Sequence, residues 1–239
     1  MKKTIRLLTF MAMGAALAFT ACGKDDDNDN NGNGGGNTGT ETAEWVDLGL
    51  PSGLLWAKCN LGATTPEGRG DYYAWGETAT KEVYNWSTYK YCTVDAEGSL
   101  QTLTKYNTST TYGTPDNLTT LQAIDDVAAQ KLGDGARMPT KEEWEELIAN
   151  TTAEWTQVNG VAGRKFTAAN GNSLFLPAAG SRWDGELYDA GEGGFYWSSS
   201  LYAGSPRGAW YFYFGSGGQG VDSGSRYGGR SVRAVRSQN

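Results

Sequence analysis

The sequence predicts an α+β fold of short, twisted antiparallel strands, two main helices and much loop. Glycine accounts for 34 of the 239 residues, and aromatic side chains make up 12% of the chain. Glycine permits tight turns and aromatic residues favour strands, so together they indicate a loop-rich fold held by aromatic packing. Two segments in the middle of the chain carry helical patterns, which supply the α part of the prediction.

Strands are expected where short apolar or aromatic runs end at glycine, proline or serine. The run Trp45–Ala57 predicts two strands around the turn Pro51-Ser52-Gly53. Residues 209–214 alternate, which places Trp210, Phe212 and Phe214 on one face and Tyr211 and Tyr213 on the other. Residues 78–114 show little periodicity and are expected to be a long, partly ordered insertion. The other expected strands are 71–76, 173–180, 195–200 and 231–236.

Two helices are predicted. Apolar residues at three-to-four spacing indicate one amphipathic helix over 118–132, ending at Gly133. A second helix begins at Thr140, which forms a capping box with Glu143, and ends near Asn150. Asp125 and Asp126 lie in the first helix, where capping or a polar environment is favoured over a paired catalytic role. The second helix should turn Trp144, Leu147 and Ile148 to the core.

The N-terminus has the organisation of a bacterial lipoprotein export signal. A basic start is followed by the uncharged run 7–21, which is too short to cross a bilayer as a stable helix. Small residues then precede Cys22 in a pattern that resembles the lipobox, although Phe19 is bulkier than the usual aliphatic residue. We expect residues 1–21 to be a signal peptide and Cys22 to carry the lipid. The alternative is an ordinary cleaved signal with Cys22 incidental.

Residues 22–43 are expected to form a flexible acidic and Gly/Asn-rich tether. Its Lys-Asp-Asp-Asp run resembles the surface-export tag of Bacteroides-group lipoproteins, and a plain solvated spacer is the alternative. Residues 44–239 are then one domain, long enough to bury a core. These features predict a protein anchored by its lipid in the outer membrane and exposed at the cell surface.

Charge, histidine and cysteine limit the chemistry open to the chain. The net charge is −7 and becomes more negative once the basic signal is removed, which argues against nucleic acid as a partner. Histidine is absent, so a His base, a His triad and a His-ligated metal are ruled out, and no cofactor or metal is expected. Cys59 and Cys92 would either form a disulfide or remain two buried thiols.

Several motifs resemble a known family. Residues 137–145 (RMPTKEEWE), together with 176–180, 196–200 and 231–236, are similar to the formylglycine-generating-enzyme branch of the C-type lectin-like fold. More closely, Trp45–Ala57 and Tyr72–Thr78 resemble the Fibrobacter succinogenes major paralogous domain of gut Bacteroides lipoproteins. The resemblance implies a C-type lectin-like fold over the whole domain.

A second resemblance concerns the C-terminal region. In some relatives this region is diversified by a retroelement that mutates adenines and so varies a ligand-binding face. Here about 181–230 would be such a display region, and ordinary surface loops are the alternative. Its ligand would be an extracellular protein or a glycan. The ligand-binding candidates are Trp183, Tyr188, Tyr202, Arg207, Tyr211, Tyr213, Gln219, Asp222, Ser223, Ser225 and Tyr227.

A binder is favoured over an enzyme. The copper-dependent enzymes of this fold need paired late cysteines and the iron-dependent ones need histidines, and the domain lacks both. Serines 198–200 have no His to activate them. The acidic loops 183–186 and 189–192 could hold calcium, but a plain acidic loop is favoured. A structural or pilus-tip-like assembly component remains the alternative to a ligand binder.

Surface exposure can be tested by protease treatment of intact cells. Because the tether should hold the domain outside the outer membrane, we expect external protease to remove residues 44–239 from whole cells. The measurement is an immunoblot of the domain, with a periplasmic protein as the control for cell integrity. A domain that survives while the control is also intact would contradict surface exposure.

Overall fold

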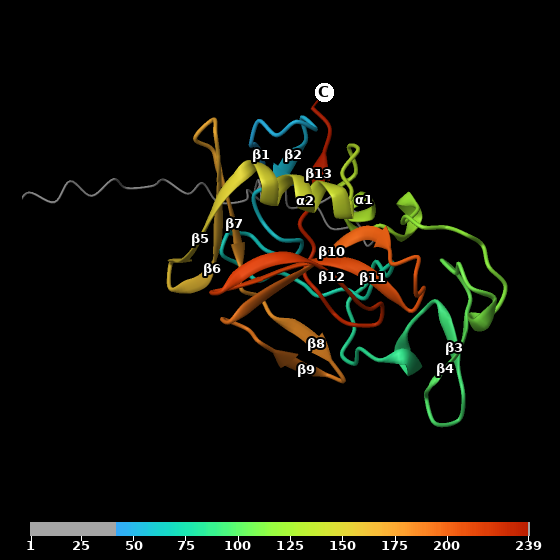
Figure 1. Cartoon of the computed structure of the whole chain (residues 1–239). Helices are drawn as coiled ribbons and strands as arrows, with labels where there is room; N and C mark the ends of the chain where they lie inside the picture. Colours follow the sequence, from blue (N-terminus) through green and yellow to red (C-terminus); the bar gives the residue numbers. More distant parts are fainter. Residues whose placement is uncertain (1–41, 239) are drawn as a thin grey trace, which may run out of the picture.

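The computed structural model describes residues 42–238 and shows five small sheets, two α-helices and long connections (Figure 1). All pairings between its strands are antiparallel, so the predicted α+β class is confirmed for this part of the chain. The strands are β1 (Trp45–Asp47), β2 (Leu55–Ala57), β3 (Cys92–Val94), β4 (Leu100–Leu103), β5 (Thr151–Val158), β6 (Val161–Ala168), β7 (Ser173–Pro177), β8 (Ser181–Trp183), β9 (Glu186–Tyr188), β10 (Gly193–Leu201), β11 (Gly208–Gly215), β12 (Gly218–Ser225) and β13 (Val235–Arg236). The helical elements are α1 (Val127–Leu132), α2 (Lys141–Asn150) and the short 3₁₀ turns η1 (Trp86–Thr88), η2 (Thr110–Tyr112) and η3 (Ala123–Asp125).

The sheet β10-β11-β12 separates two hydrophobic cores. On one face Phe212 and Phe214 pack with Trp144 of α2 and Phe166 of β6. On the opposite face a second core gathers around Trp197 and the residues of the loops before α1. Figure 1 shows α2 on one side of this sheet and the β8–β9 hairpin on the other. The predicted alternation along 209–214 is confirmed because alternate residues enter different cores.

The ends of the domain meet in the sheet β1-β2-β13. The two predicted N-terminal strands form β1 and β2 around the turn at 51–53, as expected. The expected final strand 231–236 is shortened to β13, because Ser231 bonds to β10 and Val232 accepts from Leu61 instead. The expected strand 71–76 is also absent as a strand, and Tyr73 alone forms a bridge, to Arg230.

Arg233 ties this sheet to the rest of the domain. Its side chain is fully buried, and its guanidinium donates to the carbonyls of Ala57, Lys58 and Phe175 and to the side-chain oxygen of Asn60. A buried cation must be matched by acceptors, and here carbonyl and amide oxygens from β2, β7 and the loop after β2 provide them. The hydrogen bonds of Arg233 therefore fix these segments to the C-terminal segment.

Helix α2 forms as predicted. The Thr140 hydroxyl accepts from Glu143 N at 3.3 Å, and the Glu143 carboxylate accepts from Thr140 N at 2.8 Å. Glu143 also forms a salt bridge with Arg137, with an Nη2–Oε1 distance of 2.6 Å. Trp144 and Leu147 are fully buried and Ile148 packs beside them, so the predicted core face is confirmed.

The predicted helix over 118–132 is wrong in its first half. Leu121 N donates to Ser199 O at 2.9 Å, so the chain here runs extended beside β10. Ile124 is 65% exposed although its spacing suggested a core position. The helix begins only at α1, where Asp126 accepts from Ala128 N and Ala129 N and so caps it. The predicted capping role holds for Asp126.

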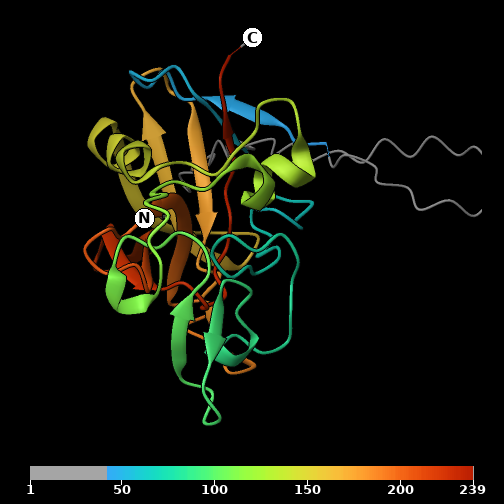
Figure 2. The ribbon, with the colours of Figure 1, turned by 90° about the vertical axis from the view of Figure 1, so that its right-hand side faces the viewer.

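The insertion 78–114 is more ordered than predicted. It contains η1, the β3–β4 hairpin and η2 (Figure 2). Its aromatic residues enter the second core. Asp125 is a buried anchor for it: its carboxylate accepts from the hydroxyls of Tyr91 and Tyr106 and from Lys105 Nζ. The hydrogen bonds explain why a segment without periodicity still folds.

The alternative that Cys59 and Cys92 form a disulfide is wrong. Cys92 is a half-buried free thiol whose sulfur donates to Trp86 O at 3.2 Å. Burial raises the pKa of this thiol above its usual range. The expectations for the signal peptide, for Cys22 and for most of the tether concern residues 1–41, which lie outside the described residues. Within the described part of the chain, none of the helices has the length and apolar character needed to cross a membrane.

The capping box makes a stability prediction. Thr140→Ala removes the oxygen that accepts from Glu143 N, so the free energy of unfolding should fall by about 1 kcal/mol. Chemical denaturation of the purified domain measures this change. Ser216→Ala, at an exposed position in the β11–β12 turn, is the control and should change the value by less than about 0.5 kcal/mol. Equal effects of the two substitutions would contradict the capping role.

Candidate functional site

The register of the β10-β11-β12 sheet divides the predicted ligand-binding residues between its two faces. Directly opposed residues of an antiparallel pair point to the same face. Tyr211 opposes Asp222 and Tyr213 opposes Gly220, so these side chains share one face. Gln219 opposes Phe214 and Ser223 opposes Trp210, so they belong to the other, together with Ser225 two residues further on. The sequence grouped these residues, and the structure does not bring them together.

Tyr202 also lies away from the Tyr211 side. Its ring packs edge-on against Trp210, with centroids 5.1 Å apart, and Lys141 of α2 lies over the same indole at 5.1 Å. Four of the predicted candidates therefore belong with the α2 side of the sheet: Tyr202, Gln219, Ser223 and Ser225.

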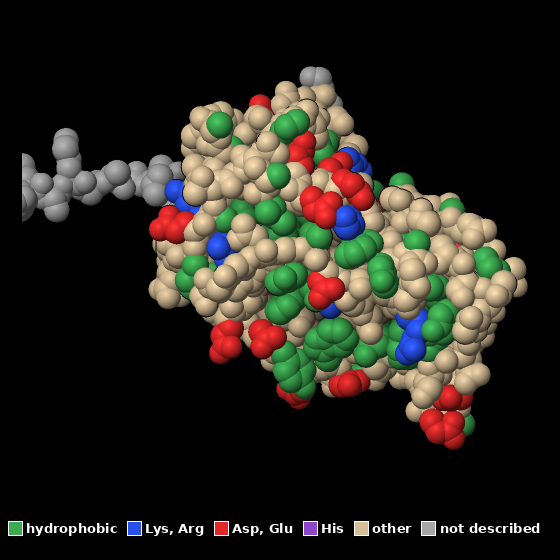
Figure 3. All heavy atoms as spheres, in the orientation of Figure 1, with side chains coloured by type: hydrophobic (Ala, Val, Ile, Leu, Met, Phe, Trp, Pro, Cys, Tyr) green, Lys and Arg blue, Asp and Glu red, His purple; other side chains and the backbone are tan. Residues whose placement is uncertain are grey.

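Four of the remaining aromatic candidates, together with Trp86, form two neighbouring groups of surface rings that we call the aromatic face. It consists of Trp86, Trp183, Tyr211, Tyr213 and Tyr227, all partly or fully exposed. The centroid distances are 6.2 Å for Tyr211–Tyr213, 5.4 Å for Trp183–Tyr227 and 4.8 Å for Trp86–Tyr227. Figure 3 shows hydrophobic side chains gathered over the β8–β9 hairpin and the adjoining sheet, with acidic groups around them.

Arg230 joins the two halves of the aromatic face. Its guanidinium carbon lies 3.6 Å from the Tyr211 ring centroid, 4.1 Å from that of Trp197 and 5.6 Å from that of Trp183. The side chain is 3% exposed, and its Nε and Nη1 have no hydrogen-bond partner among the described residues. Burial lowers the pKa of this guanidinium to about 10. The faces of three rings and the charge of Asp222 offset part of its loss of hydration.

Two further predicted candidates border the aromatic face. Arg207 is exposed and lies over the Trp86 ring at 5.6 Å and the Tyr112 ring at 5.9 Å. Tyr188 is 49% exposed on β9 and opposes Ser181. Because Ser181 and Trp183 are two residues apart on β8, Tyr188 lies on the same side of the hairpin as Trp183.

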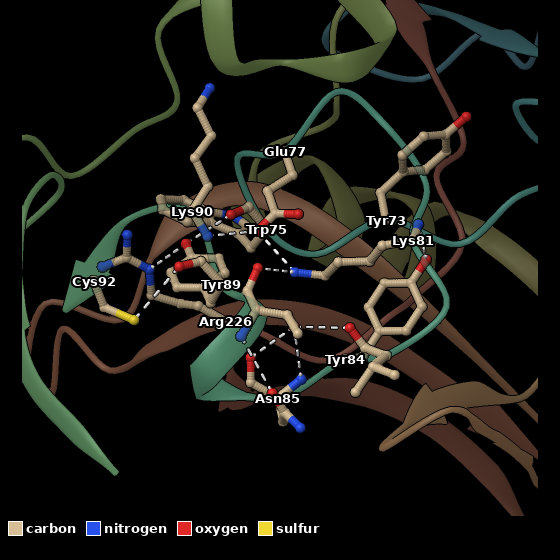
Figure 4. Close-up of polar contacts among 12 residues, drawn as sticks. Tyr73, Trp75, Glu77, Lys81, Tyr84, Asn85, Tyr89, Lys90, Cys92 and Arg226 are labelled. Atoms are coloured by element: carbon tan, nitrogen blue, oxygen red, sulfur yellow. Dashed lines mark hydrogen bonds and ion pairs between the residues drawn. The ribbon is translucent and has the colours of Figure 1, made fainter. Parts of the chain in front are cut away.

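A layer of polar contacts around Arg226, Lys81 and Asn85 joins the segments that carry the aromatic face (Figure 4). Arg226 is fully buried between the rings of Trp75, Tyr89 and Tyr106. It donates to the Tyr89 hydroxyl at 2.9 Å and to the carbonyls of Lys105, Tyr106 and Pro206. All four of these hydrogen bonds go to the insertion or to the loop before β11. They therefore hold Tyr227, the next residue, against these segments.

The turn η1 is positioned by the same layer. Asn85 caps it by accepting from Thr88 N at 3.2 Å, and its amide donates to Asp184 at 2.9 Å. Lys81 donates to the buried Glu77 carboxylate at 2.9 Å and to Thr88 O at 3.0 Å. These bonds connect Trp86 on η1 to the β8–β9 turn that follows Trp183.

A cleft of about 630 Å³ lies between residues 70–84 and the β8–β9 hairpin. Arg182, next to Trp183, lines it and stacks on Tyr72 with 5.3 Å between the guanidinium carbon and the ring centroid. Asp71, Lys81 and Glu82 also line it, so the cleft carries both signs of charge.

Sequence reasoning missed two members of this site. Trp86 lies in the insertion, and no local pattern showed that this segment folds back onto the C-terminal region. Arg230 stands in a Gly-rich run and had the appearance of a surface residue, whereas the structure buries it under β12. Gly224 permits this burial, because a Cβ there would lie 2.4 Å from Arg230 Nη2.

The chain matches the family model of the Lcl C-terminal domain over residues 49–236, so it belongs to that family. The match spans almost all of the described residues and supports a domain of this type over the stretch where the sequence resembled the major paralogous domain. Neither the curated proteins nor the solved structures contain a match to the chain. Residues 42–238 contain no group of three His, Cys, Asp or Glu side chains placed to hold a metal ion.

The polar layer makes a prediction about Arg226. Arg226→Lys keeps the charge, but one ammonium group cannot reach acceptors on four residues, so buried carbonyls lose their partners. We expect the free energy of unfolding to fall by about 2–4 kcal/mol. The exposed Arg207→Lys is the matched control and should change it by less than about 0.5 kcal/mol. Thermal or denaturant unfolding measures both, and similar values for the two variants would contradict the role of Arg226.

Proposed function

We propose that this protein is a cell-surface lipoprotein that binds an extracellular protein or glycan through the aromatic face. The observation that carries the proposal is the convergence of partly exposed rings from η1, β8, β11 and the loop after β12 on one rigid surface. Its family and its N-terminal sequence support a surface-associated protein, with Cys22 as the site of lipid attachment.

The side chains of the aromatic face suit recognition. Tyrosine and tryptophan provide a large contact area with few rotatable bonds, so little entropy is lost when a partner binds. Rings stack on the apolar faces of sugars or pack against protein side chains, while the Tyr hydroxyls remain available for hydrogen bonds. The acidic residues Asp184, Glu186 and Asp222 are exposed at the margins and disfavour polyanions such as nucleic acid.

We propose binding rather than catalysis as the activity. The domain has no histidine, and its cysteines are Cys59, which is buried, and Cys92, whose raised pKa disfavours the thiolate. Ser198 donates to Trp210 O at 2.9 Å, which is a structural contact within the sheet. These features support the absence of a nucleophile paired with a base.

A finer part of the proposal is that the C-terminal region is variable among relatives. The buried positions of β10 and β11 would form the constant framework, and exposed positions such as Tyr213 and Asp222 would vary. Sequencing the gene across isolates tests this idea. Substitutions confined to adenine-containing codons between 197 and 230, with a reverse transcriptase gene nearby, would support it, and a constant region would contradict it.

Ligand binding can be tested with glycan and protein arrays probed with the purified domain. Trp183→Ala and Tyr213→Ala each remove a ring from the aromatic face and should weaken binding of any captured ligand at least about tenfold, or about 1.4 kcal/mol. Tyr202→Ala, on the α2 side of the sheet, is the control and should retain wild-type affinity. If only Tyr202→Ala abolished binding, the binding site would lie on the α2 side of the sheet and not on the aromatic face. Failure to capture a ligand on both arrays would count against the proposal.

A further inference from the structure

Strand β12 is an exposed sheet edge. Its only strand neighbour is β11, and each of its eight residues is at least partly exposed. Among the described residues, no backbone–backbone hydrogen bond outside the β11 ladder involves residues 216–224. The register with β11 runs without a bulge from Gly208 to Gly215. This edge therefore presents a straight row of unpaired backbone groups.

The opposite edge of the same sheet is covered. Along β10, Trp197 N donates to Ser231 O, Ser199 N to Pro139 O and Leu201 N to Thr119 O. The chain thus closes one edge with several of its own segments and leaves the other open. β12 also lacks the lysine, proline or bulge with which natural proteins usually protect an open edge.

The direction of the free backbone groups follows from one hydrogen bond. Ser223 N donates to the Asp222 carboxylate at 2.7 Å and not to β11. Because alternate residues of an edge strand direct their backbone groups outward, Gln219 and Val221 share the outward orientation of Ser223. Their N–H and C=O groups are the ones that an added strand would use.

Side chains at this edge indicate the chemistry of a partner. Asp222 is exposed and is the only charged residue of β12. The Tyr213 hydroxyl lies over Gly220, since a Cβ there would be 3.1 Å from it, so the ring reaches across β12 toward the open edge. A carboxylate beside an accessible phenol ring favours a Lys or Arg side chain, by charge and by cation–π attraction.

We propose that the β12 edge accepts an extended, basic segment of a partner protein as a fourth strand of the sheet. Backbone groups of Gln219 and Val221 pair with the segment, and its basic side chains lie against Asp222 and Tyr213. A second copy of this chain is disfavoured, because its own β12 would bring another Asp222 and no cation. The β12 edge shares Tyr213 with the aromatic face, but it does not include the contacts between Trp183 and Tyr227. The proposal therefore adds a second partner to the function proposed above.

The test uses a ten-residue peptide of alternating Thr and Lys, with an alternating Thr and Glu peptide as the charge control. Binding is followed by amide chemical shifts and hydrogen exchange of the isotope-labelled domain, residues 44–239. We expect the Lys peptide to shift and protect the amides of Gln219 and Val221, and the Glu peptide to bind at least about threefold more weakly.

Two changes probe the backbone pairing. Val221→Pro removes an outward N–H without breaking the β11 ladder, and proline is tolerated at such edge positions, so peptide binding should be lost while the fold is kept. The same Lys peptide methylated on alternate backbone nitrogens requires no change in the protein and should lose binding for only one of the two methylation patterns. Equal binding of both patterns would overturn the proposal.

Side-chain recognition is tested with Asp222→Asn, which should weaken the Lys peptide about three- to fivefold. Asp189→Asn, at an exposed position in the β9–β10 loop, is the matched control and should have no effect. Trp183→Ala separates the two proposals, since it should weaken the array ligand and leave the peptide unaffected. Peptide protection elsewhere than β12, equal binding of the Glu peptide, or protection of β12 by concentration-dependent dimers would each overturn the β12 proposal.

Discussion

The fold depends on buried arginines that are solvated by the protein itself. Arg226 and Arg233 lie in the C-terminal segment and use carbonyl, amide and phenol oxygens as acceptors in place of carboxylates. Removing a guanidinium from water is costly, and the cost is met only when several acceptors from distant segments are placed around it together. Each of these arginines therefore fixes segments that are far apart in the sequence, among them the insertion, β2 and β7.

This requirement determines the surface as well as the core. Arg226 and Arg230 place the loop after β12 against Tyr89, Tyr211 and Trp183, and this builds the aromatic face. The rings are exposed on one side and held by cations and hydrogen bonds on the other. Such contacts order the rings without a ligand. The proposed binding would therefore cost little conformational freedom. The open β12 edge belongs to the same sheet, which gives the domain two adjacent surfaces with different chemistry.

Sequence-based prediction was accurate where the interacting residues are close in the sequence, and it failed where they are far apart. The capping box of Thr140 and Glu143 is local, and it was predicted correctly together with the buried Trp144. The alternation of residues 209–214 was equally clear. The helix expected over 118–132 failed because Leu121 bonds to Ser199 across the fold, which overrides its helical spacing. The long strands β5 and β6 were missed, since their Thr, Gln and Lys residues show little hydrophobic alternation and gain order by pairing with each other and with β7.

The sequence by itself predicted an export signal ending at Cys22. It also established the absence of histidine, the aromatic composition of the C-terminal region and the local helix and strand signals. Only the tertiary structure decided which of the candidate residues lie together. Strand register sends Tyr211 and Asp222 to one face and Gln219 and Ser223 to the other, because successive side chains of a strand point in opposite directions. Burial of Arg230 and docking of Trp86 depend on contacts between segments far apart in the chain. Such contacts leave no pattern in the local sequence, because the residues that make them come together only when distant segments pack against each other.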